Sequence, residues 1–588
     1  MTVMSFRGRT GRLNGPAVIL CVAILLLPAQ ASGWSDEAPA QDAPQGCFLS
    51  EKAGFTLIHL EGDPATIGRN HGSLLSEKIE RGMAAYAHCS MDWFGLSWAQ
   101  CRFNAPSYWP KVPSEYRQEI QGIASGAASM GVVNPDGATV DWIDILAYNA
   151  AWDIWWRVSP PGNKFWWLPG KGEEDWPHHC SGFASTGSWT ADGGFVLAQS
   201  LWMPYFLPPA QAVWCDLAPR QGNRIFMQLT AGMIWSGTEY YVNSAGIVAA
   251  ETTLGVGAHQ PGGTASFVRI RKAVQYAGSI DEFRDIILQD TNGAYCSDYL
   301  VADAKTNEVA VLELGGRTWA LARTMDGFLP SCNYPWDPAV AAEMGEPQGA
   351  AHGCWPRWMR LLDLAAQERG NITVEFGKMA LGDHFDVSVG YERPGSFSLC
   401  GHGENTTRGY PHGSQDAKVT NRTMAARMQV WARFGHSCGR SFLVEEQQAL
   451  HPDYAFDDLR DMIAGPWATF GAFHQLQISV MDQNGLPIQD AELRLRDRYD
   501  GNQTNITLED GRILVPYFPA GEYEVSASGN GRKATMLLVV NGSASLDIVL
   551  RGGGSPDAVP AMQAGAVAVV ALAGAISVVI WKRRRRSA

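Results

Sequence analysis

The pattern of apolar residues changes sharply between residues 154 and 179, and this change limits what the chain can fold into. Apolar residues recur every three to four positions in 65–81, 116–130 and 142–153, which predicts helices. From 180 to about 330, short β-rich runs alternate with turn residues and predict strands. The main region is therefore predicted to be α+β, with sheet at its centre.

Two glycines support close packing of the first helices. Gly68 and Gly72 are spaced one turn apart in the helical pattern, where the missing side chains allow another helix to approach. The segment 154–179 that follows the helical part is rich in Trp, Pro and Gly, which favours an irregular loop.

Cys180 stands at the end of that loop, in the run His178-His179-Cys180-Ser181-Gly182-Phe183. A cysteine of an exported protein can be a disulfide partner, and two histidines beside it can suggest a metal site. No fourth ligand shows recognisable spacing, so no metal is predicted here. The chain also lacks the G-x-S-x-G, Walker, H-E-x-x-H and EF-hand motifs.

The residues after Cys180 carry a resemblance that recurs in order along residues 55–450. The matching runs are Cys180-Ser181-Gly182-Phe183, Glu251-Thr252-Thr253, Gly293-Ala294-Tyr295, Cys332-Asn333-Tyr334-Pro335 and Asp416-Ala417-Lys418-Val419-Thr420-Asn421. They resemble the phospholipase B-like family, whose members are N-terminal nucleophile hydrolases with a cysteine nucleophile. Residues 62–75 and 122–153 also resemble the related penicillin acyltransferase family. The resemblance implies an αββα core.

The resemblance also implies a mechanism centred on Cys180. Its thiol would cut the chain after His179, and the freed α-amino group, with a pKa of about 7.7–8.0, would then serve as the base for that thiol. Asn333 would stabilise the oxyanion; otherwise it is a turn residue before Pro335.

Three further residues are expected to support or line the pocket. Trp202 matches the tryptophan that the family carries near the nucleophile. Gln199 stands where relatives often have His, so it cannot supply titratable catalysis. Thr253 either lines the pocket or simply belongs to a strand.

The predicted function is autoproteolytically activated hydrolysis of a fatty-acyl ester or amide bond through an acyl-Cys180 intermediate. The expected partner is a lipid or acyl-amide substrate, and no cofactor is predicted. Two alternatives remain open: a catalytically inactive surface binding protein on the same fold, and an acyltransferase with an amine acceptor. The net charge of -13 argues against nucleic acid as a partner.

Both ends of the chain are basic and read as membrane-targeting segments. Residues 1–31 have the layout of a secretory signal, and 32–46 form a polar linker. The small and apolar run 558–581 predicts a single transmembrane helix, with the basic tail 582–588 in the cytoplasm. These features predict a single-pass type I protein of the cell membrane with its enzyme domain extracellular or luminal, although a sorting enzyme could remove the anchor.

The remaining regions complete the predicted organisation. The helical part and the loop are predicted to occupy residues 47–179. The hydrolase core is predicted to occupy residues 180–473. Short alternating strands in 474–551 predict a small β-sandwich that resembles carboxypeptidase regulatory-like modules. Some of the ten cysteines after residue 31 are expected to form disulfides. Glycosylation is possible at sequons at Asn371, Asn405, Asn421, Asn502, Asn505 and Asn541.

Overall fold

The computed structural model describes residues 47–158, 180–256, 259–405, 411–450, 459–551, 561–564 and 570–572. Several predictions fall outside these residues: the signal 1–31, the linker 32–46, the basic tail 582–588 and His179 of the cleavage site. Of the predicted irregular loop, residues 154–158 belong to a helix, and 159–179 lie outside the described residues.

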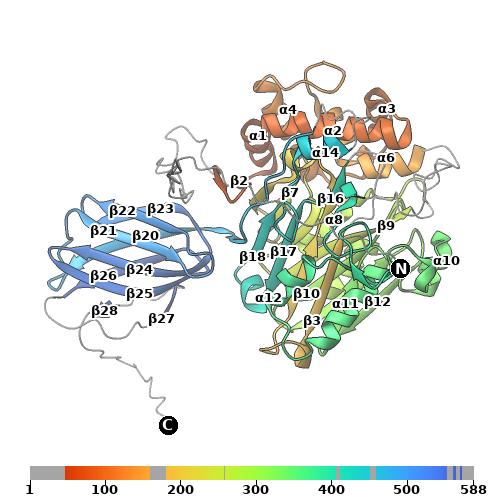
Figure 1. Ribbon diagram of the computed structural model, residues 1–588. Helices are drawn as coiled ribbons and strands as arrows, with labels where there is room; N and C mark the ends of the chain where they lie inside the picture. Colours follow the sequence, from red (N-terminus) through yellow and green to blue (C-terminus); the bar gives the residue numbers. More distant parts are fainter. Residues whose placement is uncertain are drawn as a thin grey trace, which may run out of the picture.

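A nine-stranded sheet forms one of two central layers (Figure 1). Neighbouring strands are antiparallel, except that β2 and β6 run parallel. In spatial order the strands are β1 (Cys47–Lys52), β2 (Phe55–Gly62), β6 (Val213–Pro219), β7 (Ile225–Leu229), β8 (Gly237–Asn243), β9 (Ile247–Val256), β10 (Tyr295–Asp303), β11 (Glu308–Leu314) and β12 (Trp319–Thr324).

A six-stranded antiparallel sheet forms the second central layer. Its strands are, in spatial order, β13 (Gly327–Ser331), β3 (Ser181–Thr186), β4 (Val196–Ser200), β17 (Asp416–Asn421), β18 (Gln429–Phe434) and β19 (Ala468–Gly471). Trp214 of the first sheet stacks on Phe470 of the second, with ring centroids 5.6 Å apart, inside a buried apolar cluster that joins the two layers. Because both faces of the inner strands are covered, β3 and β4 are buried along their whole length.

Helices cover the outer face of the nine-stranded sheet. They are α1 (Pro64–Leu74), α2 (Ser76–Phe94), α3 (Trp98–Asn104), α4 (Ser114–Ser129), α5 (Trp142–Asn149), α6 (Ala151–Val158), α8 (Ser266–Tyr276) and α9 (Ile280–Leu288). Gly68 and Gly72 of α1 face α4 so closely that an added Cβ would lie 2.2 and 2.1 Å from carbonyl oxygens of that helix. The two glycines therefore have the packing role that their spacing predicts.

Two further helices, α11 (Trp355–Gln367) and α12 (Val374–Leu381), pack on the outer face of the six-stranded sheet. The central layers thus follow the order helices, sheet, sheet, helices, with α1–α4 and α6 at the top of Figure 1 and α11 and α12 below them. The shorter elements of this region are β5 (Trp202–Pro204), α7 (Pro208–Gln211), α10 (Pro338–Met344), β14 (Phe385–Asp386), β15 (Tyr391–Glu392), β16 (His412–Ser414), α13 (Arg422–Ala425) and α14 (Val444–Leu450).

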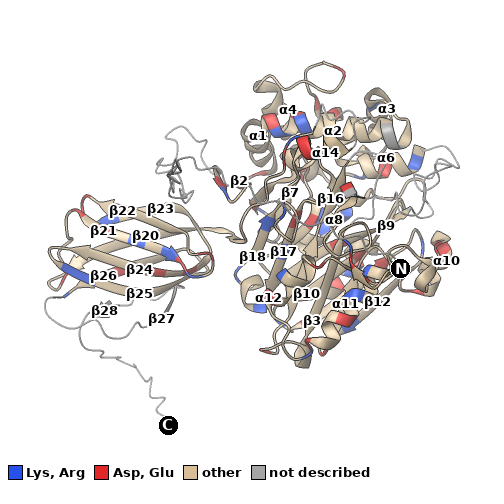
Figure 2. Cartoon of the chain, in the orientation of Figure 1, with Lys and Arg blue, Asp and Glu red and all other residues tan. Residues whose placement is uncertain are grey.

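A β-sandwich follows the layered region and has its own apolar core. Its strands are β20 (Phe473–Asp482), β21 (Ala491–Asp497), β22 (Gln503–Leu508), β23 (Arg512–Pro519), β24 (Gly521–Gly529), β25 (Arg532–Val540) and β26 (Ala544–Leu550). Buried and exposed residues alternate strictly along β21, as expected for a strand with one face on a core. Figure 2 shows acidic and basic residues interspersed on both parts of the chain; Arg427 and Glu522, for example, form an ion pair of 2.8 Å between them.

The transmembrane helix predicted over 558–581 is wrong. The described residues of this stretch form two short strands, β27 (Ala561–Ala564) and β28 (Val570–Leu572), which run parallel to β25 and β26 at the sandwich. Valine has a high propensity for strands, and the edges of the sandwich offer unpaired backbone groups to it. In the part of the chain that the structure describes, no helix has the length and apolar character needed to cross a membrane.

This finding corrects three predictions that depended on the helix. The described residues do not support a single transmembrane helix as part of the fold class, or the membrane as a partner. The predicted single-pass type I localisation in the cell membrane is overturned for the same reason.

The junction between the two parts of the chain is held by a buried carboxylate. Asp216 of β6 accepts hydrogen bonds from His59 Nδ1 (2.8 Å), from Arg224 Nε (2.7 Å) and from the backbone N–H of Phe473 (2.9 Å), where β20 begins. Burial alone would raise the pKa of Asp216, but the hydrogen bonds from His59 and Arg224 hold it well below its usual range. The start of the sandwich is thus tied to the nine-stranded sheet.

We predict that Asp216→Asn lowers the free energy of unfolding by about 3 kcal/mol at pH 7, because it leaves the Arg224 guanidinium without its charged partner. The folded-state pKa lies below the unfolded value of 3.8, so this stabilisation is present above that pH and is lost as the pH falls. Urea unfolding at pH 7 and pH 3 should therefore show a smaller difference between variant and natural protein in acid.

The matched control for this prediction is Asp281→Asn, which removes an exposed partner of Arg284 and Arg323. It should change the free energy of unfolding by less than about 1 kcal/mol. Equal effects of the two substitutions would contradict the role given to Asp216.

Candidate functional site

Cys180 lies directly before β3, the second strand of the six-stranded sheet, and its side chain is only 1% exposed. Its backbone φ is +62°, a left-handed conformation that a non-glycine residue adopts at a cost of about 1–3 kcal/mol. Two residues on, Gly182 allows the two sheets to meet, since a Cβ there would lie 2.8 Å from the Leu300 side chain of β10. The cysteine is therefore held in strained backbone between the central layers.

Arg357 of α11 fixes the backbone of Cys180. Its guanidinium, fully buried, donates to the carbonyl oxygen of Cys180 (2.5 Å) and to Ser181 Oγ (3.0 Å). It also donates to Asn333 Oδ1 (3.1 Å) and lies over the Trp202 ring, 4.6 Å from its centroid. One side chain thus brings three of the predicted site residues together.

Asn333 follows β13 and is also held in a left-handed conformation, with φ of +58°. Its Nδ2 donates to the backbone oxygen of Thr253 (2.7 Å), and its own N–H donates to Thr252 Oγ1 (3.3 Å). Because an amide nitrogen carries two N–H groups, one remains for another acceptor. This geometry is compatible with the oxyanion role that the sequence predicts for Asn333.

The other predicted pocket residues surround the same centre. Trp202 begins β5, and its backbone N–H donates towards the Cys180 sulfur. Gln199 of β4 donates from Nε2 to the Glu251 carbonyl oxygen (3.2 Å), whereas its buried Oε1 accepts no hydrogen bond among the described residues. Thr253 of β9 shares a hydrogen bond of 2.8 Å with the Tyr295 hydroxyl.

Two buried acids also act on Cys180. Glu239 accepts from the Tyr295 hydroxyl (2.6 Å), and burial raises its pKa. The pKa of Glu251 is well above its usual range because of burial and then of the Glu239 charge. Burial and these two acids together raise the pKa of the Cys180 thiol well above its usual range, so it is protonated at neutral pH.

A buried cation balances this acidic surrounding. Lys418 of β17 is fully buried, and its Nζ lies 2.7 Å from Asp416 Oδ1 on the same strand. Its charge lowers the pKa of the Cys180 thiol, although less than burial raises it. The site therefore contains a network of acidic and basic side chains in an otherwise apolar layer.

Sequence reasoning did not assign Arg357, Glu239, Glu251 or Lys418 to the site. Glu251 and Lys418 stand inside the runs that carry the family resemblance, which was a usable signal. Arg357 gave none, because an arginine on an amphipathic helix is expected to face water.

Seven of the cysteines form no disulfide, contrary to the expectation from the sequence. Free thiols are present at Cys101, Cys180, Cys215, Cys296, Cys332, Cys400 and Cys438. The reading of Cys180 as a disulfide partner is therefore wrong.

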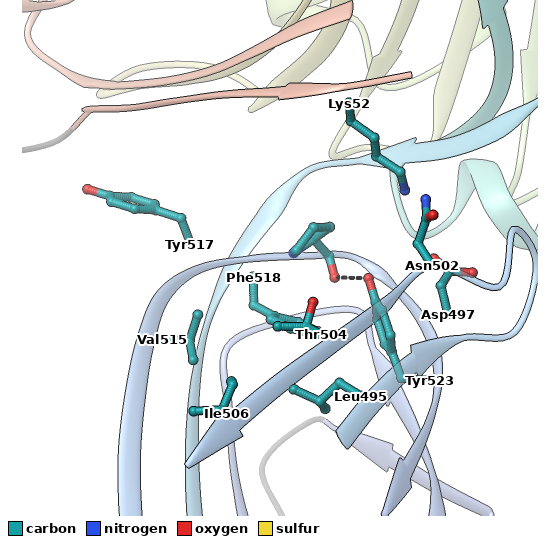
Figure 3. Close-up of a pocket in the computed structure, with 11 residues that line it drawn as sticks. Lys52, Leu495, Asp497, Asn502, Thr504, Ile506, Val515, Tyr517, Phe518 and Tyr523 are labelled. Carbon is teal, nitrogen blue, oxygen red and sulfur yellow. Dashed lines mark hydrogen bonds between the residues drawn. The ribbon is translucent and has the colours of Figure 1, made fainter. Parts of the chain in front are cut away.

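A cavity of about 110 Å³ lies away from these residues, in the sandwich and at its contact with β1 (Figure 3). Lys52 reaches it from β1, and Leu495, Val515 and Tyr523 line it from the sandwich. The Tyr523 hydroxyl donates to the Pro519 carbonyl oxygen at its wall (3.0 Å). None of the predicted catalytic or supporting residues lines this cavity.

Comparison with known proteins does not assign the chain to a family. No family model matches it. A protein of Archaeoglobus fulgidus described as uncharacterized is 24% identical over 525 residues, which cover 83% of this chain and 80% of that protein. The Bacillus anthracis TIE protein aligns with 24% of this chain and 28% of its own at 9% identity, and its TM-score of 0.12 carries no argument.

Membership of the phospholipase B-like family consequently stays a prediction. The lipid substrate was implied by that resemblance alone. Because no family model matches, a lipid substrate is not supported.

We predict that Glu251→Gln stabilises the protein at pH 8 by at least about 1 kcal/mol. The folded-state pKa of Glu251 lies above its unfolded value of 4.5, so the folded chain loses stability as the pH rises through that range, and a glutamine cannot ionise. Denaturant unfolding at pH 4 and pH 8 measures the effect, which should be absent at pH 4. The exposed Glu375→Gln is the control, and an equal gain at both pH values would contradict the buried acid pair.

Proposed function

We propose that this chain is a self-processing cysteine hydrolase, which cleaves an amide or ester bond through an acyl-Cys180 intermediate. The observation that carries the proposal is the setting of Cys180: strained backbone at the start of β3, with its carbonyl held by the buried Arg357 beside Asn333. Strained backbone and buried polar networks of this kind gather at functional sites.

Self-processing would proceed as an acyl shift from nitrogen to sulfur. The Cys180 sulfur attacks the carbonyl carbon of His179, the C–N bond breaks, and the thiol proton goes to the released amine. Water then hydrolyses the thioester, which gives a carboxylate on His179 and restores the thiol. The left-handed φ of Cys180 supports this step, because cutting the peptide bond removes the strain.

Turnover would use the new N-terminus as its own base. The α-amino group has a usual pKa of about 7.7–8.0 and can take the thiol proton at neutral pH. The resulting thiolate attacks the substrate carbonyl, and the free N–H of Asn333 Nδ2 stabilises the oxyanion. The leaving amine or alcohol takes the proton, and water releases the acid from Cys180. A free amine in place of water would make the enzyme an acyltransferase.

The uncut chain is expected to be inactive because the Cys180 thiol is protonated. With its pKa well above the usual range and its sulfur buried, Cys180 is a poor nucleophile towards a diffusing substrate before processing. The same observations, with Gln199 in place of a histidine, favour the second candidate, a binding protein that has lost catalysis.

We predict that the purified protein contains a fragment whose first residue is Cys180, and that Cys180→Ala abolishes it. N-terminal sequencing measures the cut directly. An acyl-type electrophile should label Cys180 in the cut natural protein.

Cys332→Ala is the control, because this cysteine is also buried near Arg357 and has no part in the proposed chemistry. It should leave the cut intact. An uncut natural protein whose Cys180 does not react with the electrophile would favour the binding protein instead.

We predict that Arg357→Gln slows processing by about a hundredfold, because the Cys180 carbonyl and Asn333 lose their common donor and misplacement by about 1 Å can cost that much. The time course of appearance of the Cys180 fragment measures it. Arg369→Gln, which removes a guanidinium over Trp189 outside the site, is the control. Unchanged processing in Arg357→Gln would remove Arg357 from the proposed site.

A further inference from the structure

A second cluster of reactive side chains lies in the same part of the chain. The imidazole and thiol atoms of His384, Cys400, His402 and Cys438 all lie within 4.8 Å of one another. His402 Nε2 is 3.4 Å from the Cys400 sulfur and 3.4 Å from the Cys438 sulfur. Two sulfurs and two nitrogens therefore converge on one point.

The distances fit a tetrahedral metal site. Zinc binds sulfur at about 2.3 Å and imidazole nitrogen at about 2.0–2.1 Å, so tetrahedral angles place neighbouring sulfur and nitrogen ligands about 3.6 Å apart. Both sulfur–nitrogen distances at His402 are close to this value.

The backbone already holds the donors in place. His384 lies between α12 and β14, Cys400 and His402 precede a 3-10 turn, and Cys438 follows β18. The Cys400 N–H donates to the Asp383 carbonyl oxygen (2.9 Å), which ties the first two segments together. The Arg440 N–H donates to the Cys438 sulfur (3.5 Å), a contact suited to a thiolate.

The surroundings of His402 are those of a metal ligand. Its Nδ1 is engaged by Glu404 Oε1 (2.8 Å), which leaves Nε2 pointing at the two sulfurs. Glu404 is itself fixed by the Tyr205 hydroxyl (2.8 Å) and by His436, whose Nε2 lies 3.4 Å away. Such a carboxylate–histidine pair orients the ring and makes it a better ligand.

His384 adds an independent sign of a missing partner. Its Nε2 is buried and has no hydrogen-bond partner within normal distance among the described residues, while the ring also interacts with the Cys438 thiol. Buried polar atoms are nearly always satisfied, so an atom of this kind beside two thiols needs an explanation, and a bound ion supplies one.

We propose that His384, Cys400, His402 and Cys438 bind a zinc-like divalent metal ion. Thiolate and imidazole donors select zinc over calcium or magnesium, which prefer oxygen. Four protein ligands fill a tetrahedral shell and leave no position for a substrate, so the site is structural. It is independent of the function proposed for Cys180.

The site would support the side chains that surround Cys180. Gly401, between two of the ligands, lies so close to Trp202 that an added Cβ would be 2.3 Å from the indole ring. The Arg357 guanidinium in turn lies over the Trp202 ring. A metal ion that fixes residues 400–402 therefore also fixes the indole.

The test is metal binding by the full-length protein. Mass spectrometry of elements should find one zinc per chain, and the metal-stripped, reduced protein should bind one Co²⁺. The cobalt form should show the visible ligand-field bands of a tetrahedral site and a thiolate-to-cobalt charge-transfer band. Cys438→Ser should weaken that band, and Glu404→Gln should lower the affinity for Co²⁺ by about 10–100-fold.

Cys296→Ser, which removes a buried thiol elsewhere, should leave cobalt binding unchanged. Two outcomes would overturn the proposal. The first is a natural protein that binds neither ion in a one-to-one ratio. The second is a Cys400–Cys438 disulfide in the non-reduced protein, found by peptide mapping. Because the cobalt titration uses the natural chain, it decides the question even where a variant fails to fold.

Discussion

The arrangement around Cys180 depends on the burial of a single guanidinium. Moving an arginine side chain from water into a protein interior costs several kcal/mol, and the charge cannot be given up because arginine does not deprotonate. Arg357 recovers part of this cost by donating to the Cys180 carbonyl, Ser181 and Asn333 and by lying over Trp202. These groups come from three different segments, at residues 180–181, 202 and 333, so the cation orders the site as its hydrogen bonds form.

Backbone strain gathers around Cys180. Cys180, Glu239 and Asn333 all have positive φ, although none is glycine. Each such residue costs about 1–3 kcal/mol and persists only where its surroundings leave no alternative. Here other backbone conformations are prevented by two sheets packed face to face. The Trp214–Phe226 and Trp214–Phe470 stacks lie between these sheets. The packing of the apolar core thus keeps these three residues in backbone conformations that they would leave without it.

The sequence predicted local features better than the contacts between them. Helical spacing in 142–153 corresponds to α5 and α6, and the close approach at Gly68 and Gly72 is present. Alternation in 474–551 corresponds to the sandwich strands. These features succeed because each depends on a pattern within one segment.

The errors have a common physical origin. The run 558–581 is apolar enough for a membrane, but its described residues pair with sandwich edges that no local pattern reveals. Arg357 and the Glu239–Glu251 pair are polar residues that tertiary contacts place in the interior. His384, Cys400, His402 and Cys438 have no recognisable spacing, because three separate segments bring them together.

These long-range contacts form one continuous chain through the molecule. His402 and Cys400 flank Gly401, which contacts Trp202; Trp202 contacts Arg357, which holds Cys180. The links from Gly401 to Trp202, from Trp202 to Arg357 and from Arg357 to Cys180 join residues distant in sequence, and all of these residues are buried. Since packed interiors respond to displacement by rearranging rather than by bending, a disturbance at the cysteine–histidine cluster must be felt at Cys180. The position of Cys180 therefore depends on these buried contacts and not on β3 alone.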